Sequence, residues 1–408
     1  MSLFNSARPT ASAGPSAVGT VPLPSRRAAR ALPRELSGIR LHEVPGPVPV
    51  GVIEDRRRER LTAVIRVEGG AFALAPTREQ EARLRRWGDL VAALAGANSC
   101  IRRIGFISRS IPSDTNRQLD YFEEAADPRL SSDVRDSYLE LLERYQQTAD
   151  QREVLLWISA NRGGGDLEPQ LAELREQTEH VTGMLGQAKI RVVGVLDRLQ
   201  AWQAIRSGYD PWGRADREEF AERVRRQAPQ HVGDLMELGP SSRLDEWSYV
   251  HADRGLHRTA WVAQWPSTEV GSLFFLPMIV NPYVVRAVAW VAELRDPGAA
   301  IRHAGQEALD ASVDARTMDR MGQRPTVNKQ QRWAGAFRRE RELGAGHAEV
   351  HHAAYVTTSV LGDDLGDLER AWARTETNAA AAKLRLQVLA ARQADALTLT
   401  LPLGRGLR

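Results

Sequence analysis

The spacing of apolar residues along this 408-residue chain is strand-like in some segments and helical in others. Runs rich in Val, Ile, Leu and Thr predict strands, whereas apolar residues three and four positions apart predict helices. The strands at 48–54 and 61–68 flank the charged residues 55–60, and this arrangement predicts a hairpin with a charged tip. Further along, the pattern predicts strands at 101–108, 153–160 and 189–195 and helices at 78–94, 132–145 and 167–185, with Thr77 as a cap of the first helix.

The same order of elements recurs in the second part of the chain. Strands are predicted at 256–264, 284–293, 348–359 and, less regularly, 383–390, with a helix at 365–382. Residues 270–279 form a short apolar helix or an irregular segment. Pro325 divides a long polar insertion into two antiparallel helices, because proline breaks a helix interior. A last strand is expected at 397–400.

These patterns predict an α+β protein made of two ferredoxin-like halves, each β-α-β-β-α-β with a helical insertion. Because no sequence identity between the halves is evident, the repeat is expected in the architecture alone. A disordered basic tail, 1–34, precedes the first half, and a short tail, 401–408, follows the second. The predicted domains are 35–200 with an insert at 128–149, a helical and then irregular connection at 201–250, and 251–400 with a helical hairpin insert at 297–343.

Composition narrows the classes of function. The chain is 42% hydrophobic and carries a net charge of only +3, because carboxylates are interspersed with its arginines. Such a balance is typical of a solvated surface, so nucleic acid is not an expected partner. The longest apolar run, 270–280, is about half the roughly 20 residues of a membrane span and contains Pro277. The single Cys100 excludes an intrachain disulfide and a cysteine-based zinc site.

The usual catalytic motifs do not occur. A P-loop needs a Gly-Lys pair, but Lys189, Lys329 and Lys383 follow Ala, Asn and Ala. The chain has no Gly-x-Ser-x-Gly elbow. His347 and His351 are four residues apart, a spacing that suits a metal only on a helix, and a strand is expected there. We therefore expect no catalytic, cofactor-binding or metal-binding residues and no enzymatic activity.

Two arginine groups are candidate contacts for a partner. Arg56, Arg57 and Arg58 fall on the predicted hairpin tip, and Arg338 and Arg339 fall in the second helical insertion. Each group has acidic or amide neighbours, so either a solvated surface or a contact with lipid or nucleic-acid phosphate would explain it.

Two other classes of function make distinct demands on the structure. A nucleic-acid-binding module with an open sheet face would present Trp157 and Trp290 to solvent. A small-molecule enzyme would need a deep pocket with converging polar groups.

Several phrases taken together resemble an actinobacterial family of type IV secretion or conjugation proteins. They are Val50-Gly-Val-Ile-Glu-Asp-Arg, Leu61-Thr-Ala-Val-Ile-Arg-Val, Trp261-Val-Ala-Gln-Trp-Pro, Gly346-His-Ala-Glu, Ala354-Tyr-Val-Thr-Thr and Leu401-Pro-Leu-Gly-Arg-Gly-Leu. The family is similar to the N-terminal, non-motor half of the conjugative secretion ATPases, and the resemblance covers about residues 35–408.

The resemblance implies a non-enzymatic docking component whose motor is encoded on another chain. In the fused ATPases a Pro-Leu-Gly segment leads into the motor, which makes Pro402, Leu403, Gly404 and Arg405 candidate partner contacts here. The implied partners are a separate P-loop ATPase and a small inner-membrane subunit, with a homo-oligomer left open. Family members commonly begin with a membrane-spanning hairpin, and this chain departs from that pattern. The expected location is therefore cytoplasmic, peripheral to the inner face of the cell membrane.

Overall fold

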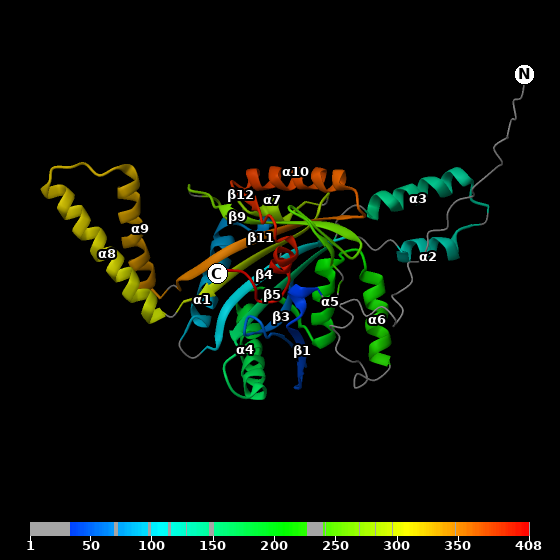
Figure 1. Cartoon of the computed structure of the whole chain (residues 1–408), viewed down its shortest axis with the longest axis horizontal. Coiled ribbons are helices and arrows are strands. Elements are labelled where there is room, and N and C mark those ends of the chain that lie inside the picture. The colour runs from blue at the N-terminus through cyan, green and yellow to red at the C-terminus, as the bar shows by residue number, and fades with distance from the viewer. Residues whose placement is uncertain are drawn as a thin grey trace, which may run out of the picture.

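A computed structural model describes residues 33–68, 72–96, 99–112, 116–127, 129–146, 151–226, 240, 242–268, 270–281, 283–295, 297–346 and 348–407. These residues form a mixed α/β protein with one large antiparallel sheet (Figure 1). The predicted tail, 1–34, lies outside them apart from Pro33 and Arg34. The short 3-10 helix η1 (Arg34–Leu36) leads directly into the sheet.

The sheet has twelve strands, and all of the described pairs are antiparallel. Its path runs β1-β2-β3-β5-β4-β10-β11-β9-β8-β7, while β6 pairs with β3 and β12 pairs with β9. The strands are β1 (Ile39–Val44), β2 (Val50–Asp55), β3 (Arg60–Glu68), β4 (Ile101–Ile111), β5 (Gln151–Asn161), β6 (Arg191–Val195), β7 (Ser242–Asp245), β8 (Val250–Ala252), β9 (Gly255–Gln264), β10 (Val285–Leu294), β11 (Val350–Leu361) and β12 (Arg385–Val388).

The two halves of the sheet repeat one pairing pattern. The order β6-β3-β5-β4 in the first half corresponds to β12-β9-β11-β10 in the second. A buried hydroxyl pair marks the same place in each half: Thr62 with Ser159 on β3 and β5, and Thr259 with Thr357 on β9 and β11. The halves meet where β4 pairs with β10, so the sheet continues across the two predicted domains.

One face of the sheet, called here the helix face, is covered by two helices in each half. Helices α1 (Thr77–Leu94) and α4 (Leu167–Gln187) cover the first half. Helices α7 (Leu276–Ile279) and α10 (Leu365–Ala381) cover the second. Each pair buries an apolar stripe against inward-facing strand residues, which is the arrangement that stabilises an amphipathic helix.

The opposite face, called here the seam face, has one core shared by both halves. It is covered by α5 (Arg198–Tyr209), the short helices α11 (Gln393–Leu397) and η5 (Thr398–Thr400), and the C-terminal segment, residues 401–407. Trp157 lies over Gly105, where an added Cβ would be 2.3 Å from the Trp157 ring. Only glycine therefore fits on β4 beneath this ring.

Two helical hairpins project from the ends of the molecule (Figure 1). Between β4 and β5 lie α2 (Asn116–Ala125) and α3 (Ser132–Gln146). Between β10 and β11 lie α8 (Pro297–Arg320) and α9 (Val327–Gly344). The second hairpin matches the predicted insert at 297–343. The first begins at Asn116, earlier than the predicted 128–149, because α2 precedes the expected helix.

Two local predictions are wrong. Residues 397–400 are helical and not a strand, because Thr398 Oγ1 donates to the Asp395 carbonyl at 2.7 Å and Thr400 Oγ1 to the Leu397 carbonyl at 3.0 Å. These local hydrogen bonds compete with a strand ladder. Thr77 does not cap α1; it is the first helical residue after Pro76, whose carbonyl accepts from the main chain of α1.

The sequence patterns missed β1, β7 and β8, the three strands beyond β2 and β9 at the sheet's outer edges. The other predicted strands are present with ends shifted by a few residues. Helix α6 (Arg214–Arg226) follows α5. Within the described residues, no helix combines the length and the apolar character that crossing a membrane requires.

Candidate functional site

The predicted arginine group at the hairpin tip lies at the exposed turn between β2 and β3. The side chains of Arg56, Arg57 and Arg58 are exposed. Arg57 Nη1 donates to the Arg34 carbonyl at 3.0 Å, and the Arg58 main-chain N–H donates to Asp55 Oδ1 at 3.2 Å. The turn closes at Glu59, whose φ of 50° is in the left-handed region. Hydrogen bonds to the Asp55 side chain and the Arg34 carbonyl thus fix the turn, while its three arginine side chains are exposed.

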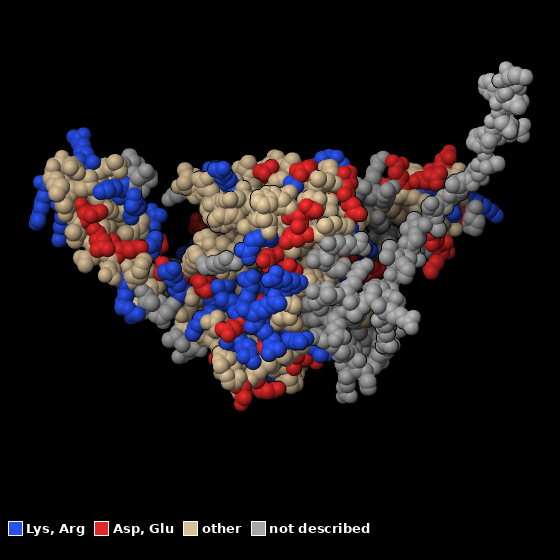
Figure 2. Space-filling view, in the orientation of Figure 1, with Lys and Arg blue, Asp and Glu red and all other residues tan. Residues whose placement is uncertain are grey.

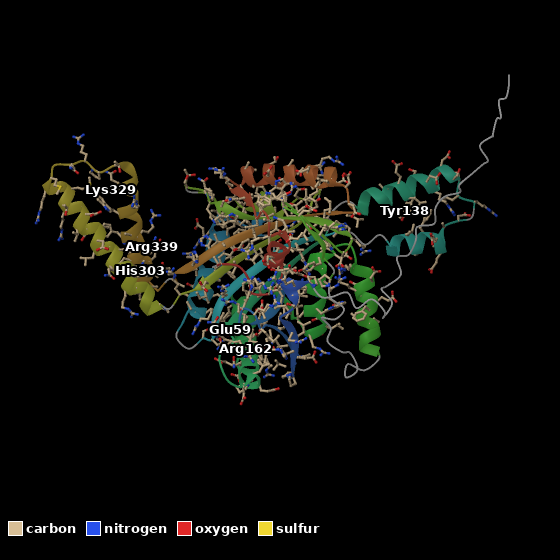
Figure 3. All side chains as sticks on the ribbon, viewed as in Figure 1. Glu59, Tyr138, Arg162, His303, Lys329 and Arg339 are labelled. Atoms are coloured by element: carbon tan, nitrogen blue, oxygen red, sulfur yellow. The ribbon has the colours of Figure 1, made fainter. Side chains whose placement is uncertain are left out.

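Two further arginines extend this group. Arg162 follows β5, and its main-chain N–H donates to the Glu59 carbonyl at 2.8 Å (Figure 3). Burial, followed by the charges of Arg103 and Arg58, lowers the pKa of Arg60. Figure 2 shows Lys and Arg side chains gathered over the region of β3 and α4. The sequence pattern places Arg60 in the charged hairpin tip but does not predict that Arg162 lies beside it, because that depends on β5 pairing with β3 across a long insertion.

The other predicted arginines lie on the α8–α9 hairpin. Arg338 and Arg339 are exposed on α9, and Arg339 bonds Glu307 of α8 at 2.5 Å (Figure 3). Apolar side chains are exposed on α8 as well, with Leu309 62% and Val313 52% accessible. The hairpin has its own small core, so it does not depend on the sheet for all of its packing.

The hairpins differ in charge. Residues 297–344 contain nine Lys and Arg against six Asp and Glu, whereas residues 116–146 contain four Arg against eight Asp and Glu. The α2–α3 hairpin also exposes apolar residues, with Tyr121 71% and Leu141 60% accessible. Figure 3 shows Tyr138 of α3 in this hairpin, and its ring lies 4.5 Å from that of Phe122 on α2. Two surfaces of opposite charge therefore lie at opposite ends of the molecule.

The four predicted C-terminal contacts are buried. Pro402, Leu403, Gly404 and Arg405 lie on the seam face, where Leu403 belongs to the shared core. A Cβ at Gly404 would come within 2.6 Å of Thr62 Oγ1 and 2.8 Å of Ser159 Oγ. The segment thus covers the hydroxyl pair of the first half, and a partner could contact these residues only if the segment left the sheet.

Arg405 anchors this segment. Its Nε donates to Asp55 Oδ2 at 2.8 Å and its Nη2 to the Glu35 carbonyl at 2.8 Å. The Leu407 main-chain N–H donates to Tyr355 Oη at 3.1 Å. Asp55 also accepts from the Arg58 main chain. The turn that carries Arg56–Arg58, called here the arginine turn, therefore shares one carboxylate with the C-terminal segment.

A cleft of about 900 Å³ opens where the ends of β3, β4 and β5 meet α5 and α6. Arg109 and Arg66 both donate to Glu153 inside it, Arg109 Nε at 2.6 Å and Arg66 Nε at 3.0 Å. Arg109 Nη1 also donates to the Ala204 carbonyl at 2.7 Å. Burial alone would raise the pKa of Glu153, but these two arginines outweigh it, so the pKa is lowered.

Arg217, in the wall of this cleft, is also nearly buried. Burial lowers its pKa to about 9, against the opposing charge of Asp210, whose carbonyl oxygen accepts from Arg217 Nη1 at 2.6 Å. The charged groups at the centre of the cleft therefore satisfy one another, an arrangement that suits a structural role at least as well as a catalytic one. Sequence reasoning did not bring these residues together, because strand ends and α6 meet only in the folded sheet.

No metal site of three His, Cys, Asp or Glu side chains occurs in the described residues. His347 lies outside them, while His351 and His352 are neighbours on β11 and so face opposite sides of the sheet.

No protein-family model matches the chain, and no curated protein matches it.

Proposed function

We propose that this protein is a non-enzymatic docking component of a type IV secretion or conjugation apparatus, with the motor ATPase on a separate chain. The observation that carries the proposal is the pair of helical hairpins that project from opposite ends of one sheet (Figure 1). A rigid sheet that holds two separate surfaces apart suits a protein that joins partners. The phrases of the sequence that resemble this family supply the biological setting.

We also propose that each half is a ferredoxin-like unit. The strand order β6-β3-β5-β4, the antiparallel pairing, and the placement of α1 and α4 on one face support this for the first half. In the second half, the strand order β12-β9-β11-β10 and the placement of α7 and α10 on one face support the same assignment. Each helical hairpin is inserted between the second and third strands of its unit.

The two hairpins are the proposed docking surfaces. Exposed aromatic and aliphatic side chains within a charged surface are typical of interaction sites, and opposite charge directs each hairpin to a different partner. The acidic α2–α3 hairpin suits a basic protein surface. The basic α8–α9 hairpin and the arginine turn at Arg56–Arg58 suit acidic partners, including the anionic inner face of a membrane. This assignment keeps the protein at the cytoplasmic side of the inner membrane.

The burial of the C-terminal segment changes where the ATPase contact is sought first. Pro402–Arg405 are buried on the seam face, so the exposed hairpins and the arginine turn are the more accessible surfaces in this conformation. The proposed partners remain a separate P-loop ATPase and a small inner-membrane subunit.

The open-sheet form of nucleic-acid binding has less support. Trp157 is 2% exposed on the seam face, and Trp290 stacks on Phe106 at 5.6 Å on the helix face. Base stacking needs an accessible ring face. Trp157 offers none, and Trp290 is half-buried with its ring stacked on Phe106.

Affinity capture from the native host tests the docking proposal. Full-length protein is expected to recover a P-loop ATPase and a small membrane protein. A variant in which a short Gly-Ser linker replaces residues 297–344 is expected to lose one of them, and the matched variant lacking residues 116–146 is expected to lose the other. Circular dichroism checks that each variant stays folded. Recovery of neither partner by the full chain, or of both by both variants, would refute the proposal.

A further inference from the structure

Among the described residues, every buried arginine except Arg286 is paired with, or attracted by, a carboxylate of the chain. Arg103, Arg109, Arg258 and Arg405 are at most 7% exposed and form ion pairs with Glu293, Glu153, Glu369 and Asp55 respectively. Arg217 is attracted by the charge of Asp210. Arg286 is 3% exposed, yet it contacts none of the described carboxylates.

One nitrogen of the Arg286 guanidinium group lacks a hydrogen-bond acceptor. Its Nη2 donates to the Pro277 carbonyl of α7 at 3.2 Å. Its Nη1 is buried and has no hydrogen-bond partner. A buried charge without a counter-charge is costly, so an anion from outside the chain would stabilise this group.

A second arginine lies close by on the same face of the sheet. The stack of Phe106 on Trp290 shows that these two side chains share the helix face, and alternation along β4 and β10 then places Ser108, Ser110 and Arg286 on it as well. Arg152 of β5 lies directly opposite Ser110, and its Nη1 donates to Ser108 Oγ at 3.3 Å.

The charge of Arg152 acts on Arg286. Burial, and then this charge, lowers the pKa of Arg286 to about 10, so Arg286 is protonated at neutral pH. Thr358, opposite Arg286 on β11, bonds Thr375 of α10 and contributes no negative charge. Two cations thus flank two serine hydroxyls, and neither cation has a carboxylate partner among the described residues.

We infer that Arg286 and Arg152, together with the hydroxyl groups of Ser108 and Ser110, form a binding site for a phosphate group. Guanidinium groups match the oxygens of phosphate in geometry and stay charged, and hydroxyls donate to the same oxygens. Arg152 is exposed, and with Ser110 it lines the edge of the cleft of about 900 Å³, so this end of the site is open to solvent. The inference does not rest on the docking role, since its four residues belong to strands β4, β5 and β10, although Ser110 and Arg152 lie near the base of the α2–α3 hairpin.

Thermal unfolding of the full chain at constant ionic strength tests this inference, with inorganic phosphate replacing chloride. Phosphate is expected to raise the melting temperature in a saturable way, because a ligand that binds only the native state stabilises it. Arg286→Met is expected to abolish the shift, whereas Arg370→Met, which removes an exposed arginine of α10 paired with Asp367, should retain it. Without phosphate, Arg286→Met is expected to be at least as stable as the wild type, because it removes an uncompensated charge.

Direct titration separates the sources of the phosphate group and covers the case in which Arg286→Met fails to fold. Arg152→Met changes a side chain at the cleft and is expected to weaken phosphate binding at least tenfold in calorimetric titration. Glycerol 3-phosphate and AMP, used in parallel, report whether the site prefers a lipid-type headgroup or a nucleotide over the free ion. Absence of a phosphate effect on the wild type, or an equal effect on wild type and both site variants, would overturn the inference.

Discussion

At the scale of single residues, the buried charged and titratable groups decide where this protein is sensitive. His257 of β9 is fully buried, with Nδ1 2.8 Å from Ser359 Oγ and Nε2 3.4 Å from the Ala252 carbonyl. Burial lowers its pKa to about 4, well below its ordinary value of 6.5. His257 is therefore neutral in the native state at pH values where the unfolded chain begins to take up a proton.

This difference predicts an acid-sensitive stability. Between pH 6.5 and 4 the unfolded state binds more protons at His257 than the native state does, so the free energy of unfolding falls as the pH falls. Its contribution is fully present above pH 6.5, and about 2 kcal/mol is expected to be lost by pH 5. His257→Gln should flatten this part of the profile in urea unfolding between pH 7.5 and 5. The exposed His180 on α4 provides the control, and if His180→Gln flattened the profile equally, burial of His257 would not be the cause.

The arginines show what sequence can and cannot predict at this scale. Exposure of Arg56–Arg58 and of Arg338 and Arg339 follows from their place in a hairpin tip and a polar helix. Nothing local distinguishes Arg405 or Arg286 from these, because each is buried by segments far away in the sequence. Arg405 meets Asp55, 350 residues earlier, and this pairing exists only because the C-terminal segment crosses the seam face.

At the scale of elements, periodicity predicted most strands because they are long and alternate. β9, β10 and β11 combine buried and partly exposed positions over ten or more residues. The short strands β7 and β8, with four and three residues, carry too little pattern to be found. The Leu-Thr alternation at 397–400 fits either a strand or a short helical turn, so the sequence pattern predicts a strand there. The hydrogen bonds of the two threonine hydroxyls favour the helical turn.

The C-terminal segment offers a matched test of packing. Gly404 and Gly322 have almost the same φ, 65° and 67°, but Gly404 lies against Thr62 and Ser159 whereas Gly322 has open space around it. Gly322→Ala is expected to cost about 1 kcal/mol, the strain of a left-handed alanine. Gly404→Ala should cost about 1–3 kcal/mol more, because its Cβ must displace buried side chains. Denaturant midpoints measure both, and equal losses would mean that the segment does not rest on the hydroxyl pair.

At the scale of the whole molecule, the two halves share both a sheet and a core. The β4–β10 pairing joins them edge to edge, and the C-terminal segment of the second half covers β3 and β5 of the first. Sequence reasoning predicted the repeated order of elements but not this union. Pairing between distant strands leaves no local pattern in either strand, and Gly404 of the C-terminal segment packs on hydroxyl groups that look solvent-exposed in the sequence.

This union predicts that the halves depend on each other for folding. A fragment ending at residue 240 lacks the C-terminal segment, loses the Arg405 partner of buried Asp55, and leaves the β4 edge unpaired. Because unpaired edges associate and the seam-face core loses the C-terminal segment that covers it, we expect this fragment to aggregate or unfold well below the full chain. Calorimetry of the full chain should show one transition for the sheet.

Coexpression of the two fragments, 1–240 and 241–408, tests the same dependence directly. Together they should form a soluble complex, because the seam face and the β4–β10 pairing can reassemble from separate chains. Disrupting the seam with Gly105→Val should prevent the complex, since a side chain there collides with Trp157, whereas Gly322→Ala should not. If the fragment ending at 240 unfolded cooperatively on its own at the temperature of the full chain, the halves would be independent domains and the shared core would contribute little to stability.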